Sequence, residues 1–260
     1  MSIKESLYFT YDGINSQDLG IINCHVETGL YQEPFLANRE LVQVKIRYND
    51  KPLFQRIKKN QIEFKLSFAF EDTWDEQSIR KIARLFDKDF YAPMIFSSNP
   101  EVIYYCLCVD DSEKIHTGLR QGYLQLQFIC DSSYAYSPTY STEVYDLTDN
   151  PPEGTIITIQ NKGDVPIKPV IKVEIIDGSS FSIQNMSNSG KTLSFSGLDV
   201  GEVLELNGEY EDITTSKPLT YRFDAMSGDF LELVYGVNNL KILGKIKIQF
   251  IYEYKILQTE

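Results

Sequence analysis

The 260-residue sequence predicts a mainly β protein, with one α-helix in its first half and an antiparallel β-sandwich in its second. Three observations lead to this fold class. Apolar and polar residues alternate through most of the chain, a single stretch has helical spacing, and turn signals recur in the second half about every 8–12 residues. Length and composition alone would indicate only a β-rich protein of one large or two modest domains.

The first sixty residues predict short strands joined by polar turns. Residues 7–21 contain two glycines and several small polar side chains, which favours a strand–turn–strand unit. Residues 41–48 alternate, which places Val42 and Val44 on one face, and a turn follows at 49–52. Residues 51–59 mix four lysines or arginines with apolar side chains, so we expect either a contact loop or a solvated surface there.

The most informative stretch runs from Ile62 to Tyr105. Strict alternation over 62–70 is typical of a strand with one buried face. Thr73 and Glu76 have the spacing of a capping box, which predicts a helix start at that point. Helical spacing follows and ends before Pro93, because proline disfavours helical geometry in the residue before it.

A single helix in a β protein is expected to pack across a sheet. The side chains that we assign to this contact are Trp74, Ile79, Ile82, Phe86 and Phe90. Strands are expected to follow at 94–96, 102–109 and 123–130, and the polar residues 110–122 predict a loop or a hairpin arm.

A change of composition marks a domain boundary after Cys130. The predicted organisation is an N-terminal domain at 1–136, a linker at 137–153 and a C-terminal domain at 154–260. Four tyrosines gather in and beside this linker: Tyr134, Tyr136, Tyr140 and Tyr145. Such aromatics could stack on sugars, fill a protein interface, or pack against their own domains.

From Thr155 onward the pattern is that of an antiparallel β-sandwich of jelly-roll type. Turn signals separate the predicted strands at 161–164, 177–180, 188–190, 197, 207–208, 227–228 and 236. The last predicted strand, with Ile246, Ile248 and Phe250 on one face, is the longest. We expect no helix in this half.

The formal net charge of −12 argues against binding to nucleic-acid phosphates or to an anionic membrane surface. It fits an ordinary acidic protein, and it also fits the wall of a channel through which DNA passes without sticking. The sequence has no run of 18 apolar residues and no signal-peptide pattern, so we expect synthesis and folding in the cytoplasm.

No catalytic, cofactor-binding or metal-binding residues are predicted. Cys24, Cys106, Cys108 and Cys130 lack zinc-site spacing and are expected to be free thiols, mostly buried. His25 and His116 have no recognisable partners for a Ser–His–Asp site. Paired carboxylates are plentiful in an acidic chain, and those at 71–76 suit a helix N-terminus. The chain is therefore not expected to be an enzyme.

Four stretches, in order along the chain, resemble one family. They are the turn at 11–21, the helical block with its flanks at 74–96, the segment Asn161-Lys162-Gly163-Asp164-Val165-Pro166-Ile167-Lys168-Pro169, and residues 228–240. Together they are similar to the distal tail proteins, the baseplate hubs of long-tailed phages that infect Gram-positive bacteria. One departure is Val234-Tyr235-Gly236, where relatives often have proline before the glycine.

The resemblance implies an N-terminal β-sandwich with one helix and an extended arm, and a galectin-like C-terminal β-sandwich. It also implies a homo-hexameric ring of N-terminal domains that joins the tail tube protein to the tail-associated spike or lysin. Receptor-binding or accessory baseplate proteins are further implied partners. The expected location is the virion tail tip, after assembly in the host cytoplasm.

Residues 31–40 and 110–122 are the candidate arms, and we expect the basic residues at 51–59 to face a neighbouring protein. The main alternative function is a carbohydrate-binding module for host cell-wall sugars. A glycoside hydrolase is disfavoured because no convergent pair of carboxylates can be named. Whether the particle is a virion or a domesticated prophage product stays open.

Overall fold

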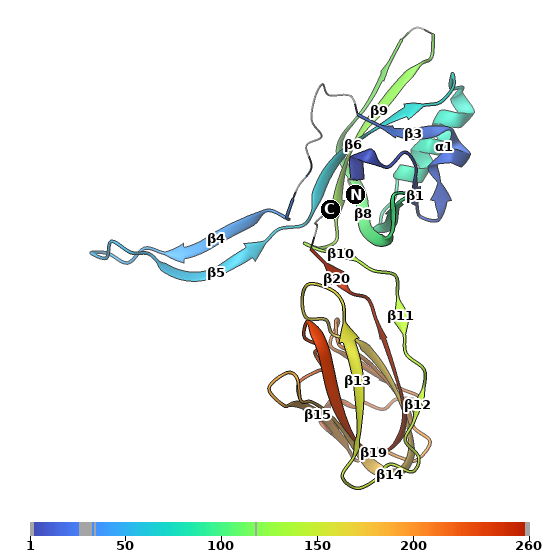
Figure 1. Cartoon of the computed structure of the whole chain (residues 1–260). Coiled ribbons are helices and arrows are strands. Elements are labelled where there is room, and N and C mark those ends of the chain that lie inside the picture. Colours follow the sequence, from blue (N-terminus) through green and yellow to red (C-terminus); the bar gives the residue numbers. More distant parts are fainter. Residues whose placement is uncertain (1–2, 26–32, 34, 118, 258–260) are drawn as a thin grey trace. The chain divides into compact units, whose positions relative to one another are not determined.

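The computed structural model describes residues 3–25, 33, 35–117 and 119–257, and it contains two compact units (Figure 1). One unit comprises Met1–Ser137 with Ile256–Glu260, and the other comprises Pro138–Lys255. Both units are built mainly from antiparallel strands, and α1 is the one α-helix among the described residues. The predicted fold class, mainly β with a single helix in the first half, is confirmed.

The first unit is organised on a sheet with the order β2-β1-β7-β8-β9-β6-β3. Its strands are β1 (Phe9–Tyr11), β2 (Ile14–Asn15), β3 (Ile21–Cys24), β6 (Glu63–Phe70), β7 (Ala92–Phe96), β8 (Asn99–His116) and β9 (Gly122–Cys130). The short strands β10 (Ala135–Tyr136) and β20 (Lys255–Ile256) pair with each other, and β10 also pairs with β8. Two 3-10 helices, Ile3–Glu5 and Ser16–Leu19, complete the unit.

Strand β6 has the buried face that its alternation predicts. Phe64, Leu66 and Phe68 are buried, whereas Glu63 and Lys65 between them are exposed. Helix α1 (Glu76–Phe86) covers this face, and the Phe86 ring stacks on the Phe68 ring at 5.6 Å. The strand and the helix thus form the core that the sequence predicts.

The two ends of α1 differ from the prediction. The N-cap is Asp75 and not Thr73, because the Asp75 carboxylate accepts a 2.7 Å hydrogen bond from the Ser78 N–H. The helix ends at Phe86. Phe90, which we expected in the helix–sheet contact, is 54% exposed, and Leu85 is buried instead. The chain leaves the helix early, and Lys88 pairs there with Asp12 beside the β1–β2 turn.

Strands β4 (Arg39–Val44) and β5 (Leu53–Lys59) form a separate two-stranded sheet. This β4–β5 hairpin projects from the rest of the first unit (Figure 1). The prediction placed a strand at 41–48, and the strand instead ends at Val44. Residues 110–122, predicted to be a loop or a hairpin arm, lie in a hairpin, because β8 extends to His116 and β9 begins at Gly122.

The second unit is a sandwich of antiparallel strands around one large apolar core. Its strands are β11 (Tyr140–Ser141), β12 (Tyr145–Asp146), β13 (Thr155–Asn161), β14 (Val170–Asn185), β15 (Lys191–Ser196), β16 (Val203–Asn207), β17 (Asp212–Thr215), β18 (Met226–Gly228) and β19 (Gly236–Tyr252). The 3-10 turn Phe223–Ala225 is the helical segment of this unit. Strand β19 is the longest in the unit, as the sequence predicts.

The turn predicted at 177–180 is wrong. Strand β14 runs through these residues, and its pairing with β19 shifts register on both sides of Asp177. The first half of β14 pairs with β16 and the second half with β15, so the polar residues form an irregularity inside one long strand. Gly244 lies opposite, at a φ of +104°, where an added Cβ would lie 2.8 Å from the Ser180 carbonyl oxygen.

The segment 137–153, predicted to be a linker, contains secondary structure. Strands β11 and β12 pair with β19 over Tyr140–Ser141 and Tyr145–Asp146. The 16 residues from Pro138 to Glu153 therefore lie in the second unit. Their Ser-, Thr- and Pro-rich composition is typical of a linker. Such residues are also common in short edge strands and turns, so composition alone does not distinguish the two.

Candidate assembly surfaces

The β4–β5 hairpin exposes apolar side chains along its whole length. All seven residues of β5 are exposed, and five apolar residues of the two strands are 41–59% exposed: Leu41, Val44, Leu53, Phe54 and Ile57. An isolated two-stranded hairpin is at best marginally stable in water. Contiguous exposed apolar surface of this kind marks an interaction site, so the hairpin is the leading candidate for one.

The base of this hairpin is closed by contacts between its two strands, and one contact joins it to the rest of the first unit. The Asn60 N–H donates to the Asn38 carbonyl at 2.8 Å, and the Asn60 side chain donates to Glu40 at 2.9 Å. Lys59 donates to the Tyr134 hydroxyl at 2.5 Å and lies 4.9 Å from the centre of that ring.

The β8–β9 hairpin forms a second projecting surface. Near its tip, the Lys114 Nζ lies 4.3 Å from the centre of the Trp74 ring, and His116 packs edge-on against the same ring at 5.4 Å. Leu119 is 76% exposed in the connecting turn. Of the two predicted arms, 110–122 is therefore this hairpin. Residues 31–32 and 34 of the arm predicted at 31–40 lie outside the described residues.

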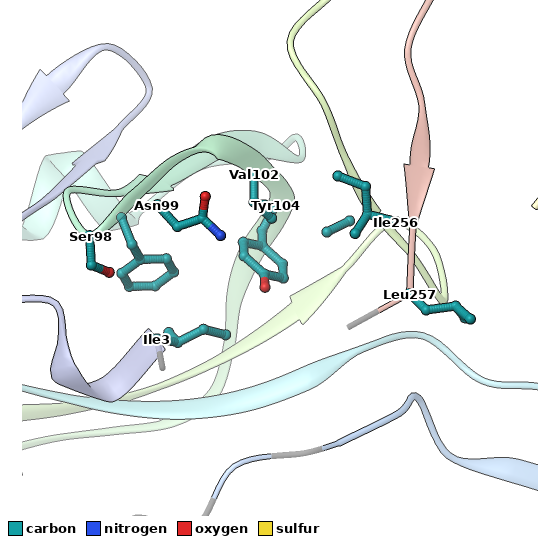
Figure 2. Close-up of a pocket in the computed structure, with 9 residues that line it drawn as sticks. Ile3, Ser98, Asn99, Val102, Tyr104, Ile256 and Leu257 are labelled. Atoms are coloured by element: carbon teal, nitrogen blue, oxygen red, sulfur yellow. The ribbon is translucent and has the colours of Figure 1, made fainter. Parts of the chain in front are cut away.

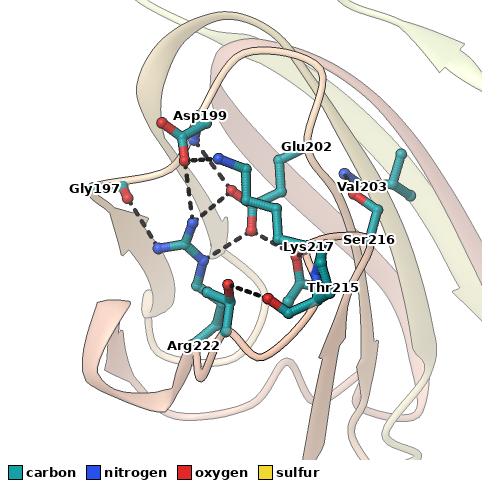
Figure 3. A network of polar contacts seen from close by, with 10 residues as sticks. Gly197, Asp199, Glu202, Val203, Thr215, Ser216, Lys217 and Arg222 are labelled. Carbon is teal, nitrogen blue, oxygen red and sulfur yellow. Dashed lines mark hydrogen bonds and ion pairs between the residues drawn. The ribbon is translucent and has the colours of Figure 1, made fainter.

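A buried ion pair in the second unit holds two loops together (Figure 3). The fully buried Glu202 carboxylate accepts from Arg222 at 2.7 and 2.8 Å, and from the Thr215 hydroxyl at 2.6 Å. Burial would raise the pKa of Glu202, but the hydrogen bonds from Arg222 and Thr215 outweigh it and hold that pKa below its ordinary value. Asp199 pairs with Lys217 across the same loops.

The predicted tyrosine cluster lies against its own units and not on a shared platform. Tyr136 packs on Tyr105 at 5.4 Å, Tyr140 on Tyr254 at 5.0 Å, and Tyr145 on Phe250 at 6.4 Å. Of the three interpretations that the sequence left open, packing against the parent domain is the one that these contacts support.

One cavity in the first unit is too small for a ligand. Ser98, Asn99, Tyr104 and Ile256 are among the residues that line a cavity of about 20 Å³ (Figure 2). This is roughly the space that one water needs. Within the described ranges, no three His, Cys, Asp or Glu side chains form a group that could hold a metal ion.

The four cysteines are free thiols. Cys106 and Cys130 are buried and face each other across β8 and β9, while Cys24 and Cys108 are half-buried. Burial raises the pKa of Cys108 to about 11 and raises the pKa of Cys106 further. These thiols stay protonated at neutral pH and behave as small apolar groups in the core.

The carboxylates at 71–76 have structural roles that the sequence suggested. Asp75 caps α1, and hydrogen bonds from the Ser78 backbone lower its pKa. Glu71 accepts from the Tyr8 hydroxyl at 3.0 Å.

His25 follows β3 and His116 ends β8. In the part of the chain that the structure describes, no helix is long and apolar enough to span a membrane.

Comparison with known proteins gives the class to which this architecture belongs. Residues 4–132 match the family described as phage tail protein N-terminal domain. The crystal structure of the SPP1 Dit (gp 19.1) protein, described as a paradigm of the hub adsorption apparatus in phages infecting Gram-positive bacteria, has the same fold. Its TM-score is 0.70 at 16% identity, over 96% of this chain and 100% of that one. The fold is thus that of a phage tail hub.

A second relative covers nearly the whole sequence. The chain is 30% identical over 255 residues to the SPbeta prophage-derived uncharacterized protein YomH of Bacillus subtilis (strain 168), covering 98% of this chain and 100% of that protein. The chain belongs to this family of phage tail proteins. The resemblance to phage tail proteins inferred from the sequence is confirmed.

Proposed function

We propose that this protein forms a homo-hexameric ring that acts as the hub between the tail tube and the tail-tip proteins. The ring lines the passage for DNA. The observation that carries the proposal is the apolar surface of the β4–β5 hairpin, which is exposed to solvent among the described residues. Burial in a neighbouring copy would remove this surface from water and order a hairpin that is weak alone.

Ring closure makes a specific demand on the protomer. A head-to-tail contact uses two different surfaces on each copy, and it closes when the rotation between copies closes. The first unit presents the β4–β5 hairpin on one side and α1 on the opposite side (Figure 1). Two distant and different surfaces on one unit suit a head-to-tail contact.

The domain roles follow from the same proposal. The N-terminal domain, predicted at 1–136, builds the ring, and the C-terminal β-sandwich lies outside it. One face of the ring binds the tail tube protein, and the other face binds the spike or lysin. Receptor-binding or accessory baseplate proteins attach to the hub, which is assembled in the host cytoplasm. The formal net charge of −12 suits a channel wall that repels DNA.

The carbohydrate-binding alternative rests on the jelly-roll fold of the second half, and a fold by itself supplies no sugar site. The linker tyrosines Tyr136, Tyr140 and Tyr145 each contact an aromatic ring of their own unit, in tilted or edge-on geometry, and this contact disfavours a shared sugar platform.

Replacing apolar residues of the hairpin tests the proposal. Leu53→Ser with Phe54→Ser should abolish rings in negative-stain images and leave a folded monomer, because these side chains are exposed in the single chain and become covered only in the assembly. The matched control is Ile156→Ser with Val237→Ser, which are 57% and 54% exposed in the second unit and should leave ring formation unchanged. Intact rings in the hairpin variant would contradict the assignment of this surface.

A further inference from the structure

Strand β13 is the longest edge strand of the second unit. It pairs with β19 over seven residues without a register shift, and among the described residues it pairs with no other strand. The other edge strands of this unit, β11, β12, β17 and β18, have two to four residues. One side of β13 is therefore open to a further strand.

The backbone of Thr158 points toward this open side. Thr158 lies opposite Asn239 in the ladder. The Asn239 carbonyl accepts from the Met186 N–H at 2.9 Å, and the Asn239 N–H donates to the Ser187 hydroxyl at 3.0 Å, both on the β14 side. Asn239 therefore directs its backbone groups away from β13, which leaves those of Thr158 on the free edge.

Gln160 confirms this direction at the end of the strand. The Tyr254 hydroxyl donates to the Gln160 carbonyl oxygen at 3.1 Å, so this carbonyl also points away from β19. The direction repeats every second residue of an antiparallel strand. The free edge thus presents the N–H and C=O groups of Ile156 and Thr158 and the N–H of Gln160.

Strand β13 lacks the features that protect a sheet edge from pairing. The usual features are charged residues, proline, bulges and short length. The sequence of the strand is TIITIQN, which has no charge, no proline and no glycine, and its ladder with β19 is regular. Ile156 is 57% exposed on its outer face. A regular, uncharged edge rich in β-branched residues is suited to pairing with another extended chain.

The chemistry of the edge selects an extended, uncharged polypeptide. Donors and acceptors that recur every second residue match the main chain of another strand. The strand is flanked by Glu153 and Lys162, which are exposed and form no ion pair among the described residues. Lys241 lies opposite Ile156 on β19, one strand away from the edge. An antiparallel segment that begins with an acidic residue and ends with a basic one would place each charge beside its opposite.

A second copy of β13 fits this edge poorly. In any antiparallel self-pairing through Ile156 and Thr158, Gln160 of one copy lies beside residues 152–156 of the other. The Tyr254 hydroxyl lies on the free side of Gln160, where the strand of the second copy would have to run. A segment of a different protein does not bring this tyrosine with it and avoids the clash.

We infer that the free edge of β13 accepts an extended, uncharged segment of another protein by strand addition, with the segment antiparallel to β13 and flanked by an acidic residue at its start and a basic residue at its end. The inference rests on the proposed hub for the source of the segment, an accessory baseplate protein. It adds the place of attachment and the chemistry of the attached segment. Main-chain hydrogen bonds supply the affinity, and the flanking charges set the direction.

A synthetic peptide tests the edge directly. The full chain is titrated with the peptide ETVTVTK, and amide hydrogen exchange is followed residue by residue. In the free protein the amides of Ile156 and Thr158 should exchange fast, whereas those of Ile157 and Ile159, which face β19, should exchange slowly. The peptide at about 1 mM should slow the exchange of Ile156 and Thr158. Unchanged exchange of these two amides would overturn the inference.

Two control peptides separate strand addition from other binding. An analogue of ETVTVTK that is N-methylated at two adjacent central residues keeps every side chain but loses main-chain donors, and should bind about tenfold more weakly. The reversed peptide KTVTVTE has the same composition and should bind about two- to fivefold more weakly, the range of an exposed ion pair. Equal binding by either control would overturn the inference, the first for the pairing and the second for its direction.

A proline variant removes one donor from the protein itself. Thr158→Pro deletes an N–H that faces the open side, a position at which edge strands tolerate proline, so the second unit should stay folded by circular dichroism. Binding of ETVTVTK should weaken by about tenfold. The control Thr158→Ser keeps the N–H and should bind like the parent protein. Full binding by a folded Thr158→Pro variant would overturn the inference.

A second copy remains the competing occupant of the edge. Exchange is therefore also measured without peptide at rising protein concentration, in the Leu53→Ser with Phe54→Ser variant, so that ring contacts do not contribute. Slower exchange of Ile156 and Thr158 at high concentration would assign the edge to a second copy and overturn the inference. Absence of rings in the parent protein would count against the proposed function and leave the peptide result standing.

Discussion

Phe86 shows how much of the first unit depends on one side chain. It is 7% exposed, and its ring lies 5.6 Å from those of Tyr11 and Phe68 and 5.8 Å from that of Phe128. These contacts join α1 to three strands of the sheet. A large aromatic side chain enclosed in this way is among the most costly to truncate.

Phe86→Ala should therefore destabilise the first unit by about 3–5 kcal/mol, the usual loss for a buried phenylalanine. The single tryptophan, Trp74, lies in this unit and reports its unfolding by fluorescence in a urea titration. Phe90→Ala is the matched control, because Phe90 is 54% exposed and should change stability by less than about 0.5 kcal/mol. Equal effects of the two substitutions would show that α1 does not have the register described.

Glu202 makes the stability of the second unit depend on pH. Its folded pKa lies below the ordinary value, so its contribution is fully present above the unfolded pKa of about 4.3. That contribution is lost as the pH falls through the folded pKa. Protonation removes the closer of the two charge partners of the Arg222 guanidinium, which is only 13% exposed, and leaves it paired with Asp199 at 3.5 Å.

Calorimetry of the full chain checks this prediction. The transition that Phe86→Ala leaves unchanged belongs to the second unit, and its midpoint should fall as the pH is lowered from 6 to 3. Glu202→Gln should lower the midpoint at pH 6 and flatten its dependence on pH, because the variant has no carboxylate to protonate. A variant whose midpoint falls as steeply as that of the parent protein would assign the pH dependence to other groups.

At the scale of elements, the spacing of apolar residues predicted which side chains lie in the core of the first unit. Strand β6 and the position of α1 follow from spacing alone, since Phe64, Leu66 and Phe68 recur every second residue and Ile82 and Phe86 lie one turn apart. The cap at Asp75 and the end at Phe86 depend on single hydrogen bonds and one ion pair, which spacing does not specify.

The β4–β5 hairpin shows the limit of the same reasoning. Residues 41–48 alternate like a strand with one covered face, yet the apolar side chains of the hairpin are exposed in the part of the chain that the structure describes. Alternation shows that a face suits burial, and it does not say which molecule buries it. The positive charge of 51–59 was visible in the sequence, but its meaning depended on the exposed sheet that the structure places there.

The long strands of the second unit show a related limit. Glycine and serine at 177–180 indicate a turn when considered locally, but β14 continues because β16 and β15 supply partners on either side of the irregularity. Similarly, the composition of 137–153 indicates a linker, while β11 and β12 form because β19 offers them an edge. In both segments the secondary structure depends on pairing with strands that are distant in the sequence. Local residue patterns carry no information about that pairing.

At the scale of the whole molecule, the second unit should fold without the first. A fragment of residues 138–255 retains every strand that pairs with β19 and the complete core. It should give an all-β circular dichroism spectrum and a cooperative melt. A fragment of residues 154–260 lacks β11 and β12 and should melt at a lower temperature, because part of β19 loses its hydrogen-bonded neighbour. Equal melting temperatures would show that 137–153 behaves as the linker that its composition predicts.

The central claim is that this tail protein is a ring-forming hub, and native mass spectrometry of the full chain tests it most directly. The chain has a mass of 29.9 kDa, so a homo-hexamer should appear at six times that mass, in equilibrium with smaller species at low ionic strength. The same sample should contain rings by electron microscopy. A protein that stays strictly monomeric at high micromolar concentration, with no rings in any salt, would contradict the account.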